Sequence, residues 1–172
     1  IHEECGVLGV YSRTTGDVAS LVYYGLYALQ HRGQEGCGIV VNEDGVFTSH
    51  KGLGLVSEVF TQEEMQKLPK GEIAVGHVRY GTTGGNNLSN CQPIQVNHLK
   101  GKLAVAHNGN LSNALLLRQE LELSGAIFHS TSDTETIAYM ITRERISAPS
   151  IEESVSNAMK KLDGAYSLVL MS

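Results

Sequence analysis

Five short motifs contain the residue types in this sequence that could do chemistry, and the first two lie at residues 5–9 and 30–34. Cys5 is a candidate nucleophile because a cysteine thiolate can form a covalent intermediate. The common alternative is that Cys5 is a small buried hydrophobe, as free cysteines often are. Arg32 lies where a helical pattern ends, so a position near the negative end of the helix dipole explains it equally well.

The other three motifs, at residues 76–80, 106–111 and 131–135, offer binding groups. Arg79 precedes a Gly-rich segment and suits bidentate capture of a carboxylate, with a surface arginine as the competing interpretation. Asn108 and Gly109 could direct an amide and a backbone N–H at one oxygen, forming an oxyanion hole, although an ordinary Asn-Gly turn would also explain them. Asp133 is a helix N-cap by default, and only the neighbouring motifs suggest that it binds an ammonium group.

Taken together, these groups match a free α-amino acid whose side chain is an amide or an ester. A nucleophile needs a base, and no His or Asp is clearly placed beside Cys5, although His31, His77 and His107 are available. A free α-amino group on Cys5 would need no side-chain partner, because its pKa of ~7.7–8.0 suits a general base near neutral pH.

Length, charge and cysteine content limit the classes of protein to consider. The 172 residues are enough for one domain, and the net charge of −5 without a basic cluster argues against nucleic-acid binding. No apolar run approaches the ~20 residues that span a bilayer, and no secretory signal is recognisable. Cys5, Cys37 and Cys91 form no CxxC pair, so we expect neither a disulfide framework nor a metal site, and a cytoplasmic location.

Hydrophobic periodicity and turn residues predict an α+β fold with mainly antiparallel sheets and helices on the outside. Strands are expected at 5–11, 38–42, 46–50, 73–80, 93–97, 102–107 and 165–171, with a hairpin turn at 43–45 and a loop at 81–90. Helices are expected at 18–30, from 61 or 62 to 68, from 110 or 112 to 123, from 132 or 133 to 145, and at 150–162. Because the last strand reaches the end of the sequence, we expect the chain to be a fragment of a longer one.

The five motifs, by their residues and by their order along the chain, resemble those of the glutaminase domains of the glutamine phosphoribosylpyrophosphate amidotransferase family, which are class II glutamine amidotransferases. This resemblance implies the N-terminal-nucleophile hydrolase fold, a four-layer αββα sandwich. It also implies hydrolysis of the glutamine side-chain amide to glutamate and ammonia through a cysteine thioester. In the intact enzyme the ammonia would convert phosphoribosyl pyrophosphate to phosphoribosylamine in purine synthesis.

The resemblance also implies roles for individual residues. Cys5 matches the family's nucleophile, whose own amine is the base, and Arg32 matches an arginine that orders its surroundings. The remaining assignments are Asn108 and Gly109 to the oxyanion hole, Arg79 with Thr82 to the glutamine α-carboxylate, and Asp133 to the α-ammonium. Residues 79–90 resemble a loop that closes over glutamine, with hinge flexibility from Gly84 and Gly85.

Other parts of the sequence differ from the family pattern or extend it. Residues 1–4 resemble the end of a propeptide, so residues 5–172 would be the glutaminase domain, inactive while residues 1–4 remain attached. A C-terminal phosphoribosyltransferase domain of the same chain would be the partner, in a homo-oligomer. The resemblance implies no cofactor in this domain; Mg²⁺ would belong to the missing half, where an iron–sulfur cluster is an open question.

Three alternatives remain at this point. The chain could be a non-catalytic regulatory domain of the same fold, or the glutaminase domain of another class II amidotransferase. It could also be a Cys/His peptidase, which would require a histidine beside Cys5, with His107 as the best candidate. Cys37 and Cys91 match no catalytic motif, so we expect them to be structural.

Overall fold

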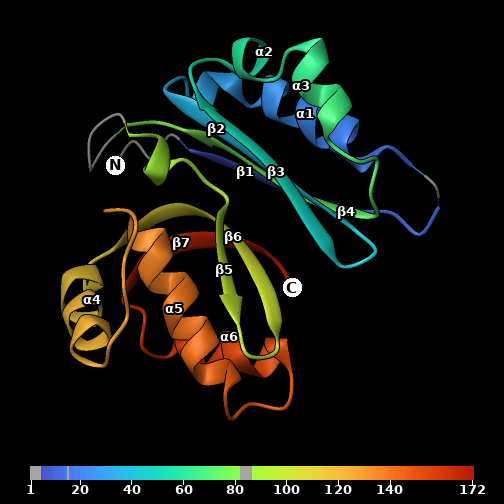
Figure 1. Ribbon diagram of the computed structural model, residues 1–172. Coiled ribbons are helices and arrows are strands. Elements are labelled where there is room, and N and C mark those ends of the chain that lie inside the picture. The colour runs from blue at the N-terminus through green and yellow to red at the C-terminus, as the bar shows by residue number, and fades with distance from the viewer. Residues whose placement is uncertain (1–4, 15, 82–86) are drawn as a thin grey trace.

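Two antiparallel sheets stack face to face in the computed structural model, which describes residues 5–14, 16–81 and 87–172 (Figure 1). Helices cover the outer face of each sheet, so the layers run helix, sheet, sheet, helix. The predicted four-layer α+β sandwich is therefore confirmed. The expected propeptide at residues 1–4, and Thr82, Gly84 and Gly85, lie outside the described residues.

The first sheet has the strand order β1-β4-β2-β3 and is entirely antiparallel. Its strands are β1 (Gly6–Tyr11), β2 (Gly36–Glu43), β3 (Val46–Leu53) and β4 (Ile73–Arg79). Helix α1 (Val18–Ala28) packs on its outer face through Val18, Val22 and Leu26, which are fully buried. The short helices α2 (Val56–Val59) and α3 (Gln62–Lys67) lie on the same side (Figure 1).

The second sheet has the order β5-β6-β7 and is also antiparallel. Its strands are β5 (Ile94–His98), β6 (Gly101–Leu111) and β7 (Gly164–Met171). Helices α4 (Ala114–Leu123), α5 (Asp133–Arg145) and α6 (Ile151–Met159) cover its outer face. Buried Ile137, Met140 and Ile141 of α5 pack with the residues of β6 in one apolar cluster, which explains why this helix is the most buried of the three.

Valine, alanine and methionine side chains form an apolar cluster between the two sheets. The buried members of this cluster are Val40, Val75, Ala104, Ala106 and Met171. A polar contact also crosses this layer, because Nε2 of buried His77 on β4 lies 3.1 Å from the carbonyl oxygen of His107 on β6. Burial lowers the pKa of His77 to about 3, so the ring is neutral and donates this hydrogen bond.

Turn and capping residues behave as their chemistry predicts. The Asp17 side chain accepts a hydrogen bond from the backbone N–H of Ser20 at 3.0 Å and caps α1. Asp44 and Gly45 both have positive φ, 51° and 81°, which matches the two-residue hairpin between β2 and β3.

Some predicted boundaries differ from the structure. Residues 108–111 continue β6 instead of turning into a helix, because they pair with residues 164–167 of β7, and α4 begins only at Ala114. Cross-strand pairing therefore overrides the turn preference of the Asn-Gly pair. Helix α1 ends at Ala28, and residues 30–32 form a separate 3₁₀ turn. The predicted bounds of α5 are confirmed, and of the two candidate caps Ser132 is the one that caps the helix. Helix α2 was not predicted.

Candidate active site

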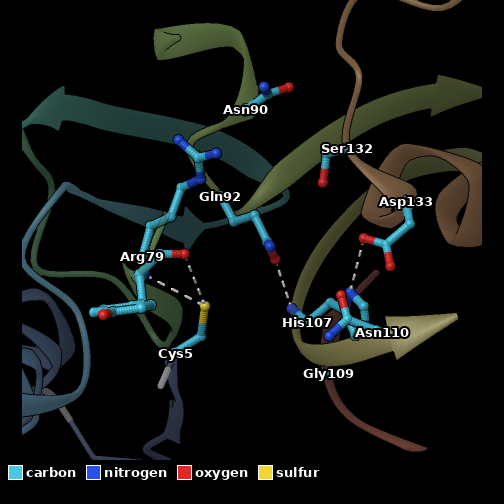
Figure 2. Close-up of a pocket in the computed structure, with 10 residues that line it drawn as sticks. Cys5, Arg79, Asn90, Gln92, His107, Gly109, Asn110, Ser132 and Asp133 are labelled. Atoms are coloured by element: carbon cyan, nitrogen blue, oxygen red, sulfur yellow. Dashed lines mark hydrogen bonds and ion pairs between the residues drawn. The ribbon is translucent and has the colours of Figure 1, made fainter. Parts of the chain in front are cut away.

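A pocket lies where β1 begins, β4 ends and the two sheets meet the start of α5 (Figure 2). Figure 2 shows Cys5 and Arg79 on one side of it and Asp133 on the other, with Gln92 between them. The residues that line the pocket are Cys5, Arg79, Tyr80, Asn90, Gln92, His107, Gly109, Asn110, Ser132 and Asp133. Four residues predicted from separate motifs, Cys5, Arg79, Gly109 and Asp133, are thus brought together.

Strand register places Cys5 beside the end of β4. Gly6 pairs with Val78, so the residue before Gly6 lies next to Arg79 and Tyr80. The Cys5 sulfur is 3.5 Å from the backbone nitrogen of Tyr80 and 3.9 Å from its carbonyl oxygen. The position of the sulfur therefore depends on backbone atoms of the neighbouring strand.

The pKa of the Cys5 thiol is raised above its ordinary value. Burial is the main cause, because it disfavours the thiolate, and the negative charge of Asp133 acts in the same direction. The backbone hydrogen bond from Tyr80 and the positive charges of Arg79 and Arg32 oppose the shift without cancelling it. A thiol in this environment needs a base to become a nucleophile near neutral pH.

The segment at residues 30–33 contacts Cys5 and the end of β4 from outside the pocket. Nε of Arg32 donates a hydrogen bond to the carbonyl oxygen of Cys5 at 2.9 Å. A Cβ on Gly33 would lie 2.6 Å from the carbonyl carbon of Arg79, so only glycine lets this segment pass so close to β4. Arg32 contacts the backbone of Cys5 and is not among the residues that line the pocket.

Arg79 is the positively charged residue in the lining of the pocket. It is the last residue of β4 and is only 6% exposed. Figure 2 shows its side chain extending along the pocket from the Cys5 side toward Asn90. Thr82, its predicted assistant, lies outside the described residues.

Gly109 and Asn108 occupy adjacent positions in β6, where they face Tyr166 and Ser167 of β7. Gly109 has a φ of +134°, and a Cβ there would lie 2.6 Å from Cα of Tyr166, so a side chain would be both strained and obstructed. Gly109 lines the pocket, together with Asn110, whereas Asn108 is half-buried and is not among the lining residues. Of the predicted pair, only Gly109 is among the lining residues, and the role of Asn108 stays a prediction.

Asp133 is the first residue of α5, and strand β6 contacts both of its carboxylate oxygens. Oδ2 accepts a hydrogen bond from the backbone N–H of Leu111 at 3.2 Å, and Oδ1 lies 3.4 Å from Nδ1 of His107. The N-terminal end of a helix also favours a negative charge. The carboxylate is therefore held at the pocket wall opposite Arg79 (Figure 2).

Two lining residues, Asn90 and Gln92, lie outside the five motifs and were not predicted as site residues, although Asn90 ends the predicted 79–90 loop. Oδ1 of Asn90 accepts a hydrogen bond from the backbone N–H of Thr131 at 3.0 Å, and its Nδ2 donates to the Thr131 hydroxyl at 2.9 Å. Oε1 of Gln92 accepts from the backbone N–H of His107 at 2.6 Å. Both amides connect the segment before β5 to the Asp133 side of the pocket, and no local sequence signal marks them.

Glu135 shapes the loop that leads into α5. This carboxylate is 4% exposed and accepts hydrogen bonds from the backbone N–H groups of His129 and Ser130 and from the Ser130 hydroxyl. The last two are 2.8 and 2.6 Å long. The conspicuous acidic residue at the end of the 131–135 motif thus stabilises the loop rather than contacting the pocket.

The two remaining cysteines lie apart from this chemistry. Cys37 and Cys91 are free and fully buried, and burial raises the pKa of Cys37 to about 12. Within the described ranges, no three His, Cys, Asp or Glu side chains come together in a way that could hold a metal ion. Over the same ranges, no helix has the length and apolar character needed to cross a membrane.

The sequence matches one family model and a group of curated proteins. The family model described as a glutamine amidotransferase domain matches residues 83–172, just over half of the chain. The amidophosphoribosyltransferase of Methanocaldococcus jannaschii is 48% identical over 97% of this chain, and that of Bacillus subtilis is 44% identical over all of it. Each alignment covers only 35% of the relative, so the chain spans about a third of the length of these curated relatives.

Solved structures of amidotransferases are also similar to this chain. The glutamine phosphoribosylpyrophosphate amidotransferase from B. subtilis, complexed with ADP and GMP, superposes with a TM-score of 0.86 at 42% identity, over 96% of this chain and 35% of that one. A predicted glutamine amidotransferase from Pseudomonas aeruginosa, at 16% identity and a TM-score of 0.52, shares the fold. With the family model matched over more than half of its length, this chain belongs to the glutamine amidotransferase domain family.

Proposed function

We propose that this domain hydrolyses the side-chain amide of L-glutamine to glutamate and ammonia, with Cys5 as the nucleophile. The observation that carries the proposal is the pocket that combines Cys5, Arg79, Gly109 and Asp133. A cation and an anion on opposite sides of the pocket complement the α-carboxylate and α-ammonium of an amino acid. The sulfur lies at the same pocket, where a bound side chain could be attacked.

In the proposed reaction the α-amine of Cys5 takes the thiol proton, and the thiolate attacks the amide carbon of glutamine. Asn108 and the backbone N–H of Gly109 would stabilise the negative oxygen of the tetrahedral intermediate. The carbon–nitrogen bond then breaks, and the protonated amine gives its proton to the departing ammonia. Water hydrolyses the thioester, which releases glutamate and restores the thiol.

This chemistry requires a free amino group on Cys5, so residues 1–4 are proposed to be a propeptide remnant that must be removed. The raised pKa of the Cys5 thiol supports the need for a base. Both sulfur contacts described here are to the backbone of Tyr80, which leaves the amine as the proposed base.

The similarity to amidophosphoribosyltransferases suggests what happens to the ammonia. We propose that a phosphoribosyltransferase domain of the same polypeptide, in a homo-oligomer in the cytoplasm, uses it to convert phosphoribosyl pyrophosphate to phosphoribosylamine. The hydrolysis needs no cofactor in this domain. Mg²⁺ is assigned by the same proposal to the other domain, as would be any iron–sulfur cluster.

The Cys/His peptidase alternative is not favoured by the contacts of His107. Its Nδ1 lies between Thr134 Oγ1, at 3.3 Å, and Asp133 Oδ1, at 3.4 Å, and not on the Cys5 sulfur. A non-catalytic regulatory domain would keep the fold and could lose the nucleophile, the cation and the anion. All three are retained at this pocket.

A covalent trap tests the proposal. The chain that begins at Cys5 is incubated with a diazoketone analogue of glutamine, and its intact mass is measured with and without excess L-glutamine. We expect one adduct on Cys5, prevented by L-glutamine but not by L-leucine, and none in Cys5→Ser. A chain that forms no adduct and releases no ammonia from glutamine would be a regulatory domain. Retained hydrolysis in Cys5→Ala, which has no nucleophilic side chain, would remove Cys5 from the mechanism.

A further inference from the structure

The proposed mechanism leaves several polar residues of the pocket without a role, and one of them is the buried histidine His107. We propose that His107 is a positioning residue that fixes the Asp133 carboxylate for the substrate ammonium, and so sets the selectivity for an α-amino group. This inference rests on the proposed function, because it assigns the α-ammonium to Asp133.

Contacts from several sides hold His107 in place. The residue is 2% exposed, and its backbone N–H donates to Oε1 of Gln92 at 2.6 Å. Its carbonyl oxygen accepts from Nε2 of His77 at 3.1 Å, across the space between the sheets. Its ring packs edge-to-face on Tyr166 with a centroid distance of 6.2 Å. The ring therefore has a fixed place before any substrate arrives.

Nδ1 is the polar atom of the ring that has partners. It lies 3.4 Å from Oδ1 of Asp133 and 3.3 Å from the Thr134 hydroxyl (Figure 2 draws the Asp133 contact). A carboxylate oxygen can only accept, so an unprotonated Nδ1 would place two lone pairs against each other. Nε2 is buried without a hydrogen-bond partner among the described residues. The favourable tautomer therefore carries its hydrogen on Nδ1 and directs it at the carboxylate.

Strand β6 thus supplies a contact to each oxygen of Asp133. The backbone N–H of Leu111 donates to Oδ2, and the His107 ring faces Oδ1. The two contacts fix the rotation of the carboxylate about its own axis, which one contact alone would leave free. A carboxylate fixed in this way has lone pairs left for an ammonium group, and correct alignment of such a partner matters because small misplacements weaken binding and catalysis.

The test measures selectivity rather than activity alone. For the chain that begins at Cys5, kcat/KM is determined for L-glutamine and for 4-carbamoylbutanoate, which is glutamine without its α-amino group. The ratio of the two values is the preference for the amino group. His107→Leu should lower this ratio by about 10–100-fold, as is typical when a supporting hydrogen bond to a functional group is removed. The loss should appear in KM for glutamine more than in kcat.

Two further variants separate positioning from simple structural damage. His107→Asn places an amide nitrogen near the position of Nδ1 and should restore the ratio to within about threefold. His107→Gln places its amide nitrogen near the position of Nε2, away from Asp133, and should not restore it. Since the Asn and Gln variants carry the same functional group, this pair decides the question even if His107→Leu does not fold.

The matched control is the neighbouring buried histidine. His77→Gln keeps a donor near the Nε2 position of His77 and has no contact with Asp133, so the preference ratio should not change. If His107→Leu lowers kcat/KM for both substrates equally, or if His77→Gln changes the ratio as much as His107→Gln, the histidine is only structural and the inference is overturned.

Asp133→Asn distinguishes a failure of this inference from a failure of the proposed function. Asp133→Asn should itself lower the preference ratio, and adding His107→Leu to it should lower the ratio no further, because the two residues act through one carboxylate. If Asp133→Asn leaves the ratio unchanged, Asp133 does not bind the ammonium and the proposed site assignment is wrong. If Asp133→Asn lowers it and His107→Leu does not, only the positioning role is wrong.

Discussion

The two sides of the pocket are built in different ways. On the side of the first sheet, Cys5 directly precedes β1 and Arg79 ends β4, the strand that pairs with β1. The described contacts of the Cys5 sulfur are to backbone atoms of Tyr80. On the opposite side, Asp133 and His107 belong to a network of side chains that continues through Thr134. The first side depends on strand register, and the second depends on hydrogen-bonded side chains.

This difference predicts different responses to substitution. Changes near Cys5 should act through the chain terminus and the strand, whereas changes around Asp133 should act through the orientation of polar groups and weaken substrate recognition in steps.

The largest effect on activity should come from the amino group of Cys5, on the side of the first sheet. With residues 1–4 attached, the nitrogen of Cys5 is an amide, which is not basic near neutral pH, and the proposed base does not exist. We therefore expect no glutaminase activity from the chain as written. The chain that begins at Cys5 should be active, with kcat/KM rising through pH ~7–8, the range of an α-amine. Ammonia release measures both.

The control for this comparison is the mass of each purified chain, because cleavage after Glu4 would convert one into the other. Equal activity from a chain whose mass still includes residues 1–4 would contradict the amine mechanism. A histidine side chain would then be the better candidate for the base that takes the Cys5 thiol proton.

The second largest effect concerns the proposed oxyanion hole at residues 108–109. Asn108→Ala should lower kcat by ~10²–10³ with little change in KM, because an oxyanion donor acts mainly in the transition state. Asn110→Ala is the matched comparison, since Asn110 is two residues along the same strand and lines the pocket. If Asn110→Ala lowers kcat and Asn108→Ala does not, the donor has been assigned to the wrong amide.

The charged pair across the pocket should show a smaller effect, and mainly in KM. Asp133→Asn keeps the shape of the side chain and removes its charge, and Arg79→Gln replaces the charged side chain by a shorter, neutral polar one. Each should lower kcat/KM for glutamine by at least about 30-fold, or about 2 kcal/mol, as for loss of one partner of a buried charged contact. A change below about threefold in either variant would remove that residue from the binding assignment.

Much of the fold could be predicted because local and long-range preferences agree. Asp17 before an apolar helix and Asp44-Gly45 between two apolar runs are signals that act within a few residues, and both appear where predicted. The turn predicted from the Asn-Gly pair at 108–109 was wrong, because the preference for a turn is local, whereas the observed strand depends on pairing with residues 164–167 of β7. No window around Asn108 contains that information.

The same distinction applies to the pocket. Cys5, Arg79, Gly109 and Asp133 could be proposed because each belongs to a recognisable motif, and the structure places them at one pocket. Asn90 and Gln92 could not, since their partners Thr131 and His107 are 41 and 15 residues away in the sequence. The supporting residues of a site are visible only once the segments that they connect are known.

The smallest predicted effect compares the two sides through one property, the pKa of the Cys5 thiol. Arg79 lowers that pKa and Asp133 raises it, while burial, the main cause of the raised value, is unchanged by either substitution. Arg79→Gln should therefore raise the pKa and slow labelling of Cys5 by iodoacetamide at a fixed pH below it, because less thiolate is present. Asp133→Asn should lower the pKa and speed labelling. Cys37 and Cys91, both fully buried, are internal controls that should stay unlabelled in the folded chain. The rates are read as the mass of the Cys5 peptide over time at several pH values. If both variants shift the rate in the same direction, the charges of the two sides do not act on the sulfur, and a change in its burial is the better explanation.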